Sequence, residues 1–295
     1  MSLDDLSNLR LAKAESAEDL ARRIARDRLA TSRQHERELE EAVLPPRRVG
    51  SVKYLNAVPL TRGLEDQIVF ATPSELAAML RAGDLDAALV SVTEVLFNDC
   101  YDVLDGIAVA SLGEVRSVFL AHRVALDQIR QVFCDTASLT SVNLLKVLMA
   151  ERGLTPELVP LRDYADAAGQ DAVLLIGDPA IDFLRASHGH TIWDLGVAWN
   201  ELTRLPFVYA VWALRRGVET GALRHILREA RTFGLETLDD IIQSRREYDL
   251  EFRRDYLGWN IHYHLGEDEK RGLSKFIDLL RKHGAAQVFE PGYVV

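Results

Sequence analysis

Cysteine and long apolar runs are scarce in this chain of 295 residues. Its two cysteines, Cys100 and Cys134, are too few for a disulfide framework and wrongly spaced for a zinc knuckle, which fits a reducing compartment. The longest uninterrupted apolar run covers residues 207–214, well short of the roughly 18 residues that a membrane-spanning helix needs. The chain opens with Asp4 and Asp5 instead of the basic start and apolar stretch of a secretory signal. These absences predict a cytoplasmic protein with no membrane span.

An excess of basic residues is also missing. Acidic residues number 45 and basic residues 35, so the formal net charge is −10. A field of this sign repels phosphate backbones, and no clustered basic stripe is visible, which excludes nucleic acid as an expected partner. The hydrophobic share of 48% and the charged share of 27% are those of an ordinary globular protein. The length predicts about two domains.

Sequence motifs that indicate a specific chemistry are absent as well. The chain has no GxGxxG, no P-loop, no GxSxG and no HExxH, so nothing supports a nucleotide cofactor or a zinc hydrolase. His262 and His264 are two residues apart and are of a residue type that binds metals. On a strand we expect them to point away from each other, so we predict no metal site.

The first 46 residues differ from the rest. They contain no aromatic residue and no glycine, while 18 of them are charged. Ser16 begins a capping-box pattern, and apolar residues then recur at helical spacing from Ala17 to Leu29. We expect one amphipathic helix in an appendage that ends at the linker Pro45-Pro46.

From residue 47 onward, short strand-like runs alternate with helical runs, as is typical of α/β sheets. Thr72 is expected to cap a helix, because Pro73 follows it and Glu75 lies three residues on. Gly83 is expected to end that helix, and Asp178, which precedes a proline, is expected to cap another. Strands are predicted at 49–54, 67–71, 87–90, 131–134, 172–176 and 207–214, and late helices at 222–233, 238–254 and 270–283.

Two polar residues stand where ligands of such sheets collect. Asn56 follows the first predicted strand, and the carboxyl edge of strands is the usual ligand position; the alternative is that Asn56 only forms a turn before Pro59. Ser117 stands after the glycine turn at Gly113, at the start of a predicted strand. Taken alone, its hydroxyl would be expected to bond to the backbone.

A third stretch, residues 135–141, is a hydroxyl-rich loop that runs into a predicted helix. Helix N-termini bind anions through free N–H groups, and hydroxyls add donors without adding charge. Ser138, Thr140 and Ser141 therefore either bind a carboxylate or only cap the helix. In a fourth stretch, residues 203–212, the aromatic side chains are expected in the core.

Together these stretches resemble the chorismate dehydratase family of the futalosine route to menaquinone. The matching pieces are 49–60, 80–89, 113–118, 140–142, 174–178, 194–196 with Trp199, and 203 with 205–212, and fragments of 256–276 echo the helical tail of the family. The likeness covers about residues 47–290. One departure is Arg204, where the family usually has glycine.

The resemblance implies a fold and a division into lobes. The expected fold is the two-lobed α/β fold of type 2 periplasmic-binding proteins, with mixed sheets flanked by helices and an added N-terminal helical segment over 1–46. The first lobe is expected to be discontinuous, comprising 47–120 and 212–295, with crossings near 118–124 and 206–214. The second lobe is expected to cover 121–211, with the substrate between the two.

The resemblance also implies an activity. Members of the family remove water from chorismate to give 3-[(1-carboxyvinyl)oxy]benzoate, and no cofactor is needed because the ring becomes aromatic. The functional Asn and Ser of the family map onto Asn56 and Ser117, expected to face each other and to orient a carboxylate of the substrate that takes the proton. The residues expected to contact the substrate are Ser111, Gly113, Ser138, Thr140, Ser141 and Asp178.

Two other functions compete with this hypothesis. The same fold often serves as a plain solute-binding module, here for a small carboxylate, and fold alone does not fix function. The second is the sibling enzyme of the same pathway that forms a dihydroxynaphthoate. The start Tyr-Leu-Asn-Ala-Val-Pro at 54–59 favours the dehydratase, and the sequence leaves the oligomeric state open.

Overall fold

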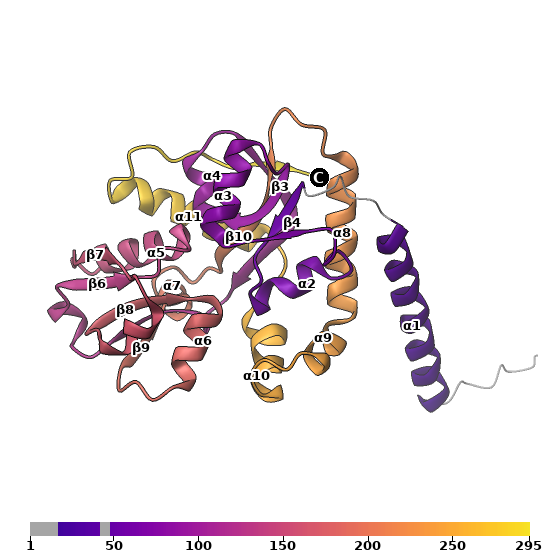
Figure 1. The fold of residues 1–295 in the computed structure, drawn as a ribbon, viewed down its shortest axis with the longest axis horizontal. Helices are drawn as coiled ribbons and strands as arrows, with labels where there is room; N and C mark the ends of the chain where they lie inside the picture. The colour runs from indigo at the N-terminus through magenta and orange to yellow at the C-terminus, as the bar shows by residue number, and fades with distance from the viewer. Residues whose placement is uncertain (1–16, 42–47) are drawn as a thin grey trace, which may run out of the picture.

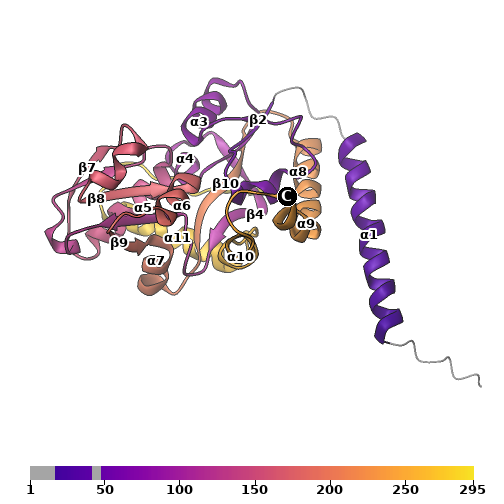
Figure 2. The same ribbon diagram turned by 60° about the horizontal axis from the view of Figure 1, so that its bottom comes forward.

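The computed structural model describes residues 17–41 and 48–295, and it has two lobes, each built on one sheet. Figures 1 and 2 show the lobes side by side, with the first sheet near the C-terminus and the second at the far end of the molecule. Both sheets are mixed, because parallel and antiparallel pairs occur in each. The expected two-lobed α/β fold with mixed sheets is confirmed.

The sheet of the first lobe has six strands in the order β11-β4-β10-β3-β1-β2. Only β10 runs antiparallel to its neighbours, since β1 pairs in parallel with β2 and β3, and β11 pairs in parallel with β4. The strands are β1 (Val49–Ser51), β2 (Val69–Phe70), β3 (Ala87–Ser91), β4 (Tyr101–Ser111), β10 (Phe207–Arg215) and β11 (Gly292–Val294). The helices are α2 (Val58–Thr61), α3 (Pro73–Ala82), α4 (Val92–Phe97), α8 (Gly221–Glu236), α9 (Leu238–Ser244), α10 (Leu250–Asp255) and α11 (Glu267–Lys282).

The sheet of the second lobe has five strands in the order β7-β6-β8-β5-β9. Its strands are β5 (Val118–His122), β6 (Gln131–Cys134), β7 (Glu157–Pro160), β8 (Ala172–Ile176) and β9 (Thr191–Asp194). Its helices are α5 (Leu139–Ala150), α6 (Gly177–Arg185) and α7 (Leu195–Thr203). The strands β6 and β8 begin and end at the predicted residues.

The chain crosses between the lobes earlier than expected at both crossings. All of β5 pairs within the second sheet and all of β10 within the first, so the expected boundaries at 120 and 212 would each cut through a strand. The first crossing is the segment 112–117 between β4 and β5, and the second is the segment 204–206 between α7 and β10. All residues of a strand form their backbone hydrogen bonds within one sheet, so the lobe boundary lies in the loop before the strand.

The helix α3 forms as its sequence predicts. The Thr72 hydroxyl accepts a hydrogen bond from the Glu75 N–H, and the Glu75 carboxylate accepts one from the Thr72 N–H at 2.8 Å. Gly83 ends the helix with a φ of +85°. This capping box, with its left-handed glycine, confirms both expected ends.

Two expected helix starts or lengths are wrong. The helix α6 begins at Gly177, so Asp178 lies in its first turn and does not cap it. The helix expected over 238–254 is broken between Ser244 and Leu250. The buried guanidinium of Arg253 donates hydrogen bonds to the carbonyls of residues 242, 247 and 248, and these bonds fold the chain back on itself.

Arg204 stands in a backbone conformation that favours glycine. It ends α7 with a φ of +60° and a ψ of 22°, and a left-handed conformation costs an L-residue with a side chain roughly 1–2 kcal/mol. The departure from the glycine of the family therefore keeps the turn and adds a modest strain.

The helix α1 (Ala17–Glu41) runs beside α8 at the edge of the first lobe (Figures 1 and 2). Leu39 is buried near Phe233 and Gly63, and the His35 ring lies 2.7 Å from the Glu236 carboxylate. The predicted amphipathic helix is thus present, while the Ser16 cap and the proline linker lie outside the described residues. Among the described helices, none combines the length and apolar composition that crossing a bilayer requires.

Candidate functional site

A cavity lies between the lobes and draws its lining from both. Polar groups reach it from Tyr54, Asn56 and Ser91 of the first lobe and from Ser138 and Ser141 of the second. Apolar side chains make up most of the remainder, and the empty volume is about 550 Å³, open solvent included. None of the described residues that line it carries a formal charge. The cavity can therefore recognise a ligand through hydroxyl, amide and backbone groups.

Asn56 and Ser117 come together beside Tyr256, although 60 residues separate them in the chain, and of the two only Asn56 lines the cavity. Asn56 lies in the 3-10 turn Leu55–Ala57, which follows β1 after the short segment 52–54, and it lines the cavity. Ser117 is buried just before β5, where its hydroxyl makes a long hydrogen bond of 3.4 Å to the Val115 carbonyl. Both side chains lie beside the phenol of Tyr256.

Tyr256 is the site residue that the sequence analysis missed. Burial raises the pKa of this phenol, whereas hydrogen bonding to Ser117 and to Asn56 lowers it. Neither contact meets strict hydrogen-bond geometry, so the buried hydroxyl is left without a well-formed partner. Tyr256 opens a π-helical turn, Tyr256–Asn260, and such turns often occur at functional sites. The sequence carried only a weak signal, a Tyr-Leu pair in a stretch read as helical tail.

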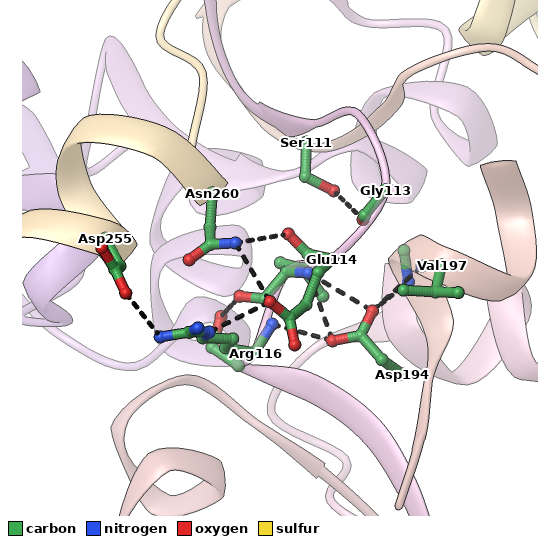
Figure 3. A network of polar contacts seen from close by, with 11 residues as sticks. Ser111, Gly113, Glu114, Arg116, Asp194, Val197, Asp255 and Asn260 are labelled. Atoms are coloured by element: carbon green, nitrogen blue, oxygen red, sulfur yellow. Dashed lines mark hydrogen bonds and ion pairs between the residues drawn. The ribbon is translucent and has the colours of Figure 1, made fainter. Parts of the chain in front are cut away.

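The loop that carries Ser117 is fixed by Asp194, as Figure 3 shows. The Asp194 carboxylate accepts hydrogen bonds from the N–H groups of Val115 at 3.2 Å and Arg116 at 2.8 Å. It also accepts two bonds from the first turn of α7, at 2.9 and 3.0 Å. Burial raises the pKa of this carboxyl, and the backbone hydrogen bonds oppose that shift. Arg116 adopts a φ of +61°, so the carboxylate holds a strained turn next to Ser117.

The tail of the first lobe holds the same loop from the other side. The Asn260 side-chain amide donates to the Glu114 carbonyl at 3.2 Å, and Arg116 lies 3.5 Å from the Asp255 carboxylate (Figure 3). Ser117 is thus positioned by contacts from both lobes.

Ser111 and Gly113 do not line the cavity. The Ser111 hydroxyl donates to the Gly113 carbonyl at 3.2 Å and lies 3.1 Å from the Tyr209 hydroxyl, and Tyr209 itself lines the cavity. The structure therefore places the pair behind Tyr209, where they support the loop.

The hydroxyl-rich loop divides into two roles. The Ser138 hydroxyl caps α5 by accepting from the Ser141 N–H, and both serines line the cavity. Thr140 faces α4 of the other lobe instead, where its hydroxyl accepts from the Thr93 N–H at 3.1 Å. Capping and access to the cavity thus coexist at Ser138, and carboxylate binding stays a prediction.

Asp178 joins the two lobes close to Asn56. Its carboxylate accepts a hydrogen bond from the Leu55 N–H at 3.2 Å. Burial raises the pKa of Asp178 to about 6, although this hydrogen bond opposes the shift. Next to it, Gly177 has a φ of +61°, and a Cβ there would lie 3.2 Å from the Tyr54 ring. A glycine at this place lets the ring of Tyr54 lie against the backbone and close one wall of the cavity.

His262 and His264 lie side by side, contrary to expectation. Their rings are 5.5 Å apart between centroids and inclined by 17°. The expectation was wrong because residues two apart in an extended chain lie on the same face. Neither histidine lines the cavity.

Comparison with known proteins adds the following. A family model described as menaquinone biosynthesis matches residues 47–282. The chorismate dehydratase of Thermus thermophilus is 35% identical over 255 residues, 79% of this chain and 94% of that protein. The chorismate dehydratase of Campylobacter jejuni is 27% identical over 230 residues, 76% of this chain and 89% of that protein.

Solved structures share the fold at low identity. A protein of Archaeoglobus fulgidus superposes with a TM-score of 0.65 at 19% identity, covering 80% of this chain and 97% of that one. The periplasmic aliphatic sulphonate binding protein of Escherichia coli superposes with a TM-score of 0.54 at 16% identity, covering 86% and 94%. The fold is that of the periplasmic-binding proteins.

Asp178→Asn should change how stability depends on pH. The carboxyl has a pKa of about 3.9 in an unfolded chain and of about 6 here, so the folded state binds its proton more tightly. Its contribution to stability is present below about pH 4 and is lost as the pH rises to about 6. Urea unfolding at pH 4 and pH 7 should show the variant gaining roughly 1–3 kcal/mol relative to the parent at the higher pH.

Asp127→Asn, which removes an exposed carboxylate of the same lobe away from Asp178, is the matched control. Equal pH dependence of Asp178→Asn and the control would show that Asp178 does not titrate in this way.

Proposed function

The chain belongs to the menaquinone biosynthesis family, and we propose on that basis that it is a chorismate dehydratase, a hydro-lyase of the cytoplasm. The 35% identity to the Thermus thermophilus enzyme over most of both chains supports the activity. The observation that carries the proposal is the meeting of Asn56 and Ser117 beside Tyr256, next to an uncharged cavity between the lobes that Asn56 lines.

The reaction would remove the hydrogen at C3 and the hydroxyl at C4 of chorismate. The C3 proton passes to a carboxylate of the substrate, and the electron pair of the C3–H bond forms the new ring double bond as the C4–O bond breaks. The carboxylate returns this proton to the departing hydroxyl, which leaves as water and gives 3-[(1-carboxyvinyl)oxy]benzoate with an aromatic ring. Neither an amide nor an unactivated hydroxyl titrates near neutrality. Asn56 and Ser117 therefore act as donors that orient the carboxylate, and the substrate supplies its own base.

The cavity suits a mechanism in which the protein orients the substrate and the substrate supplies the base. Most of its lining is apolar, and an apolar surrounding strengthens each donor aimed at developing charge. The Ser141 hydroxyl and the first turn of α5 supply donors for a second carboxylate, because helix N-termini favour anions. Ser91 and Ser138, whose hydroxyls lie 3.0 Å apart, join the lobes at the same wall. These contacts hold both halves of the cavity together around a bound dianion.

Incubating the purified protein with chorismate and identifying the product by mass spectrometry tests the proposal. We expect loss of one water and an aromatic ultraviolet spectrum. Binding of chorismate without turnover would favour a solute-binding module. Release of a dihydroxynaphthoate from the larger pathway substrate, with no action on chorismate, would favour the sibling enzyme.

Ser117→Ala and Asn56→Ala should each reduce turnover by about 10²–10³, the usual effect of removing one preorganised donor. Their melting temperatures should stay near that of the parent. Ser187→Ala, which removes an exposed hydroxyl, is the control and should leave both quantities unchanged. Full activity in Ser117→Ala or Asn56→Ala would remove that residue from the mechanism, and a large drop in melting temperature would assign it a structural role.

Tyr256→Phe should lower kcat about tenfold with little change in KM, because the phenol positions Asn56 and Ser117 and lies outside the cavity lining. The substitution removes a buried hydroxyl that lacks a well-formed partner, so the melting temperature should hold or rise. Unchanged kcat in this variant would show that the two donors need no phenol beside them.

Ser141→Ala should weaken chorismate binding roughly ten- to a hundredfold, since a hydrogen bond to a charged group contributes about 1.5–3 kcal/mol. Thr140→Val is the comparison variant, because it breaks the hydrogen bond between Thr140 and Thr93 that joins the two lobes. We expect it to lower the melting temperature as well as the affinity for chorismate. Calorimetry with the two variants separates these effects. Parent-like affinity in Ser141→Ala would leave the Ser141 hydroxyl with its bond to the Ser138 hydroxyl as its only role.

A further inference from the structure

His262, His264 and Glu269 converge at the start of α11, away from the cavity. Their ligand atoms all lie within 4.8 Å of one another, and the His264 Nε2 is 3.1 Å from a Glu269 carboxylate oxygen. Two imidazoles and one carboxylate are the donor set that zinc takes where it keeps one position open. Imidazole donors also favour zinc over magnesium or calcium, which prefer oxygen ligands.

The carboxylate is held in place by its own backbone contact. Glu269 is 3% exposed, a rare degree of burial for a glutamate. One of its oxygens accepts a hydrogen bond from the Gly266 N–H at 2.9 Å, and the other faces His264. A ligand oriented by a second hydrogen bond is the usual arrangement in metal sites.

The backbone places both histidines in the segment that precedes α11. His262 exchanges two backbone hydrogen bonds with Ala110 of β4, at 2.7 and 3.0 Å. Its Nδ1 is buried and makes no hydrogen bond within the described part of the chain. The His264 side chain is 53% exposed, so it can move toward a cation and leaves a coordination position open to solvent.

The nearby cations are engaged elsewhere. Arg231 donates to the Tyr263 carbonyl at 3.4 Å, and Lys270 lies 2.9 Å from the Asp105 carboxylate. Glu267 and Asp268 add negative charge in the first turn of α11. The competing explanation is an ion pair between His264 and Glu269 that only supports the helix start.

We propose that His262, His264 and Glu269 form a binding site for zinc or a similar divalent transition metal, completed by solvent. The bound ion would tie β4, through the backbone pairing of His262, to the start of α11. The site is separate from the cavity and independent of the proposed dehydratase activity.

Calorimetric titration of untagged, chelator-treated full-length protein with zinc chloride tests the site. We expect one equivalent to bind, with magnesium unable to compete. His264→Ala and Glu269→Gln should each weaken zinc binding by at least tenfold, the lower end of what even outer contacts of a metal site cost. Glutamine keeps an oxygen acceptor for the Gly266 N–H, so this variant should fold.

His35→Ala is the matched control, because His35, Glu38 and Glu229 form the other cluster with such spacing among the described residues. Zinc should raise the melting temperature of the parent and of His35→Ala in a concentration-dependent way, but not that of His264→Ala. Absence of a saturable zinc equivalent, unchanged affinity in His264→Ala, or loss of binding in His35→Ala would each overturn the assignment.

Discussion

The half-buried carboxylate of Asp194 connects the two crossings between the lobes. It accepts backbone hydrogen bonds from the first crossing, at Val115 and Arg116, and from the start of α7, which leads to the second. Removing such an acceptor would leave several buried N–H groups unpaired, and each unpaired group costs about 1–3 kcal/mol. The positive φ of Arg116 persists because these bonds hold it, and the position of Ser117 follows from that turn.

Aromatic packing supports the second crossing in the same region. The Trp199 ring contacts Phe207 and Phe276 at centroid distances of 5.1 and 5.9 Å, and its indole N–H donates to the Pro206 carbonyl at 3.0 Å. These contacts join α7 of the second lobe to β10 and α11 of the first lobe. The walls of the cavity away from the crossings are joined by fewer bonds, mainly those between serine and threonine hydroxyls and the Asp178 contact. Opening of the lobes would therefore pivot about the crossings.

Local chemistry made part of this structure predictable. The capping box at Thr72 and the glycine after α3 are read from neighbouring residues, and the strands β6 and β8 from short apolar runs. The break before α10 was not predictable, because it depends on a buried Arg253 that bonds carbonyls up to 11 residues away. The lobe boundaries likewise depend on which sheet a strand joins, and that is a long-range choice.

The same limit applies to the prediction of the site residues. Asn56 and Ser117 were expected through the family resemblance, and the structure brings both beside Tyr256, while their roles stay a prediction. Tyr256 was missed, since nothing near it in the chain indicates that a distant turn would lie beside Asn56. Thr140 was expected to contact the substrate together with its neighbours, but one step along a helix turns a side chain by about 100°. That rotation places its hydroxyl against the other lobe.

The absence of formal charge on the described residues that line the cavity has a consequence for discrimination between ligands. A lysine or arginine would attract any anion over a distance set by the ionic strength. Hydroxyl and amide dipoles act only at contact, where the direction of each donor decides the energy. If the cavity holds the proposed substrate, it would sort dianions by the placement of their carboxylates around the ring, and an isomer of equal charge with one carboxylate displaced would gain little from it.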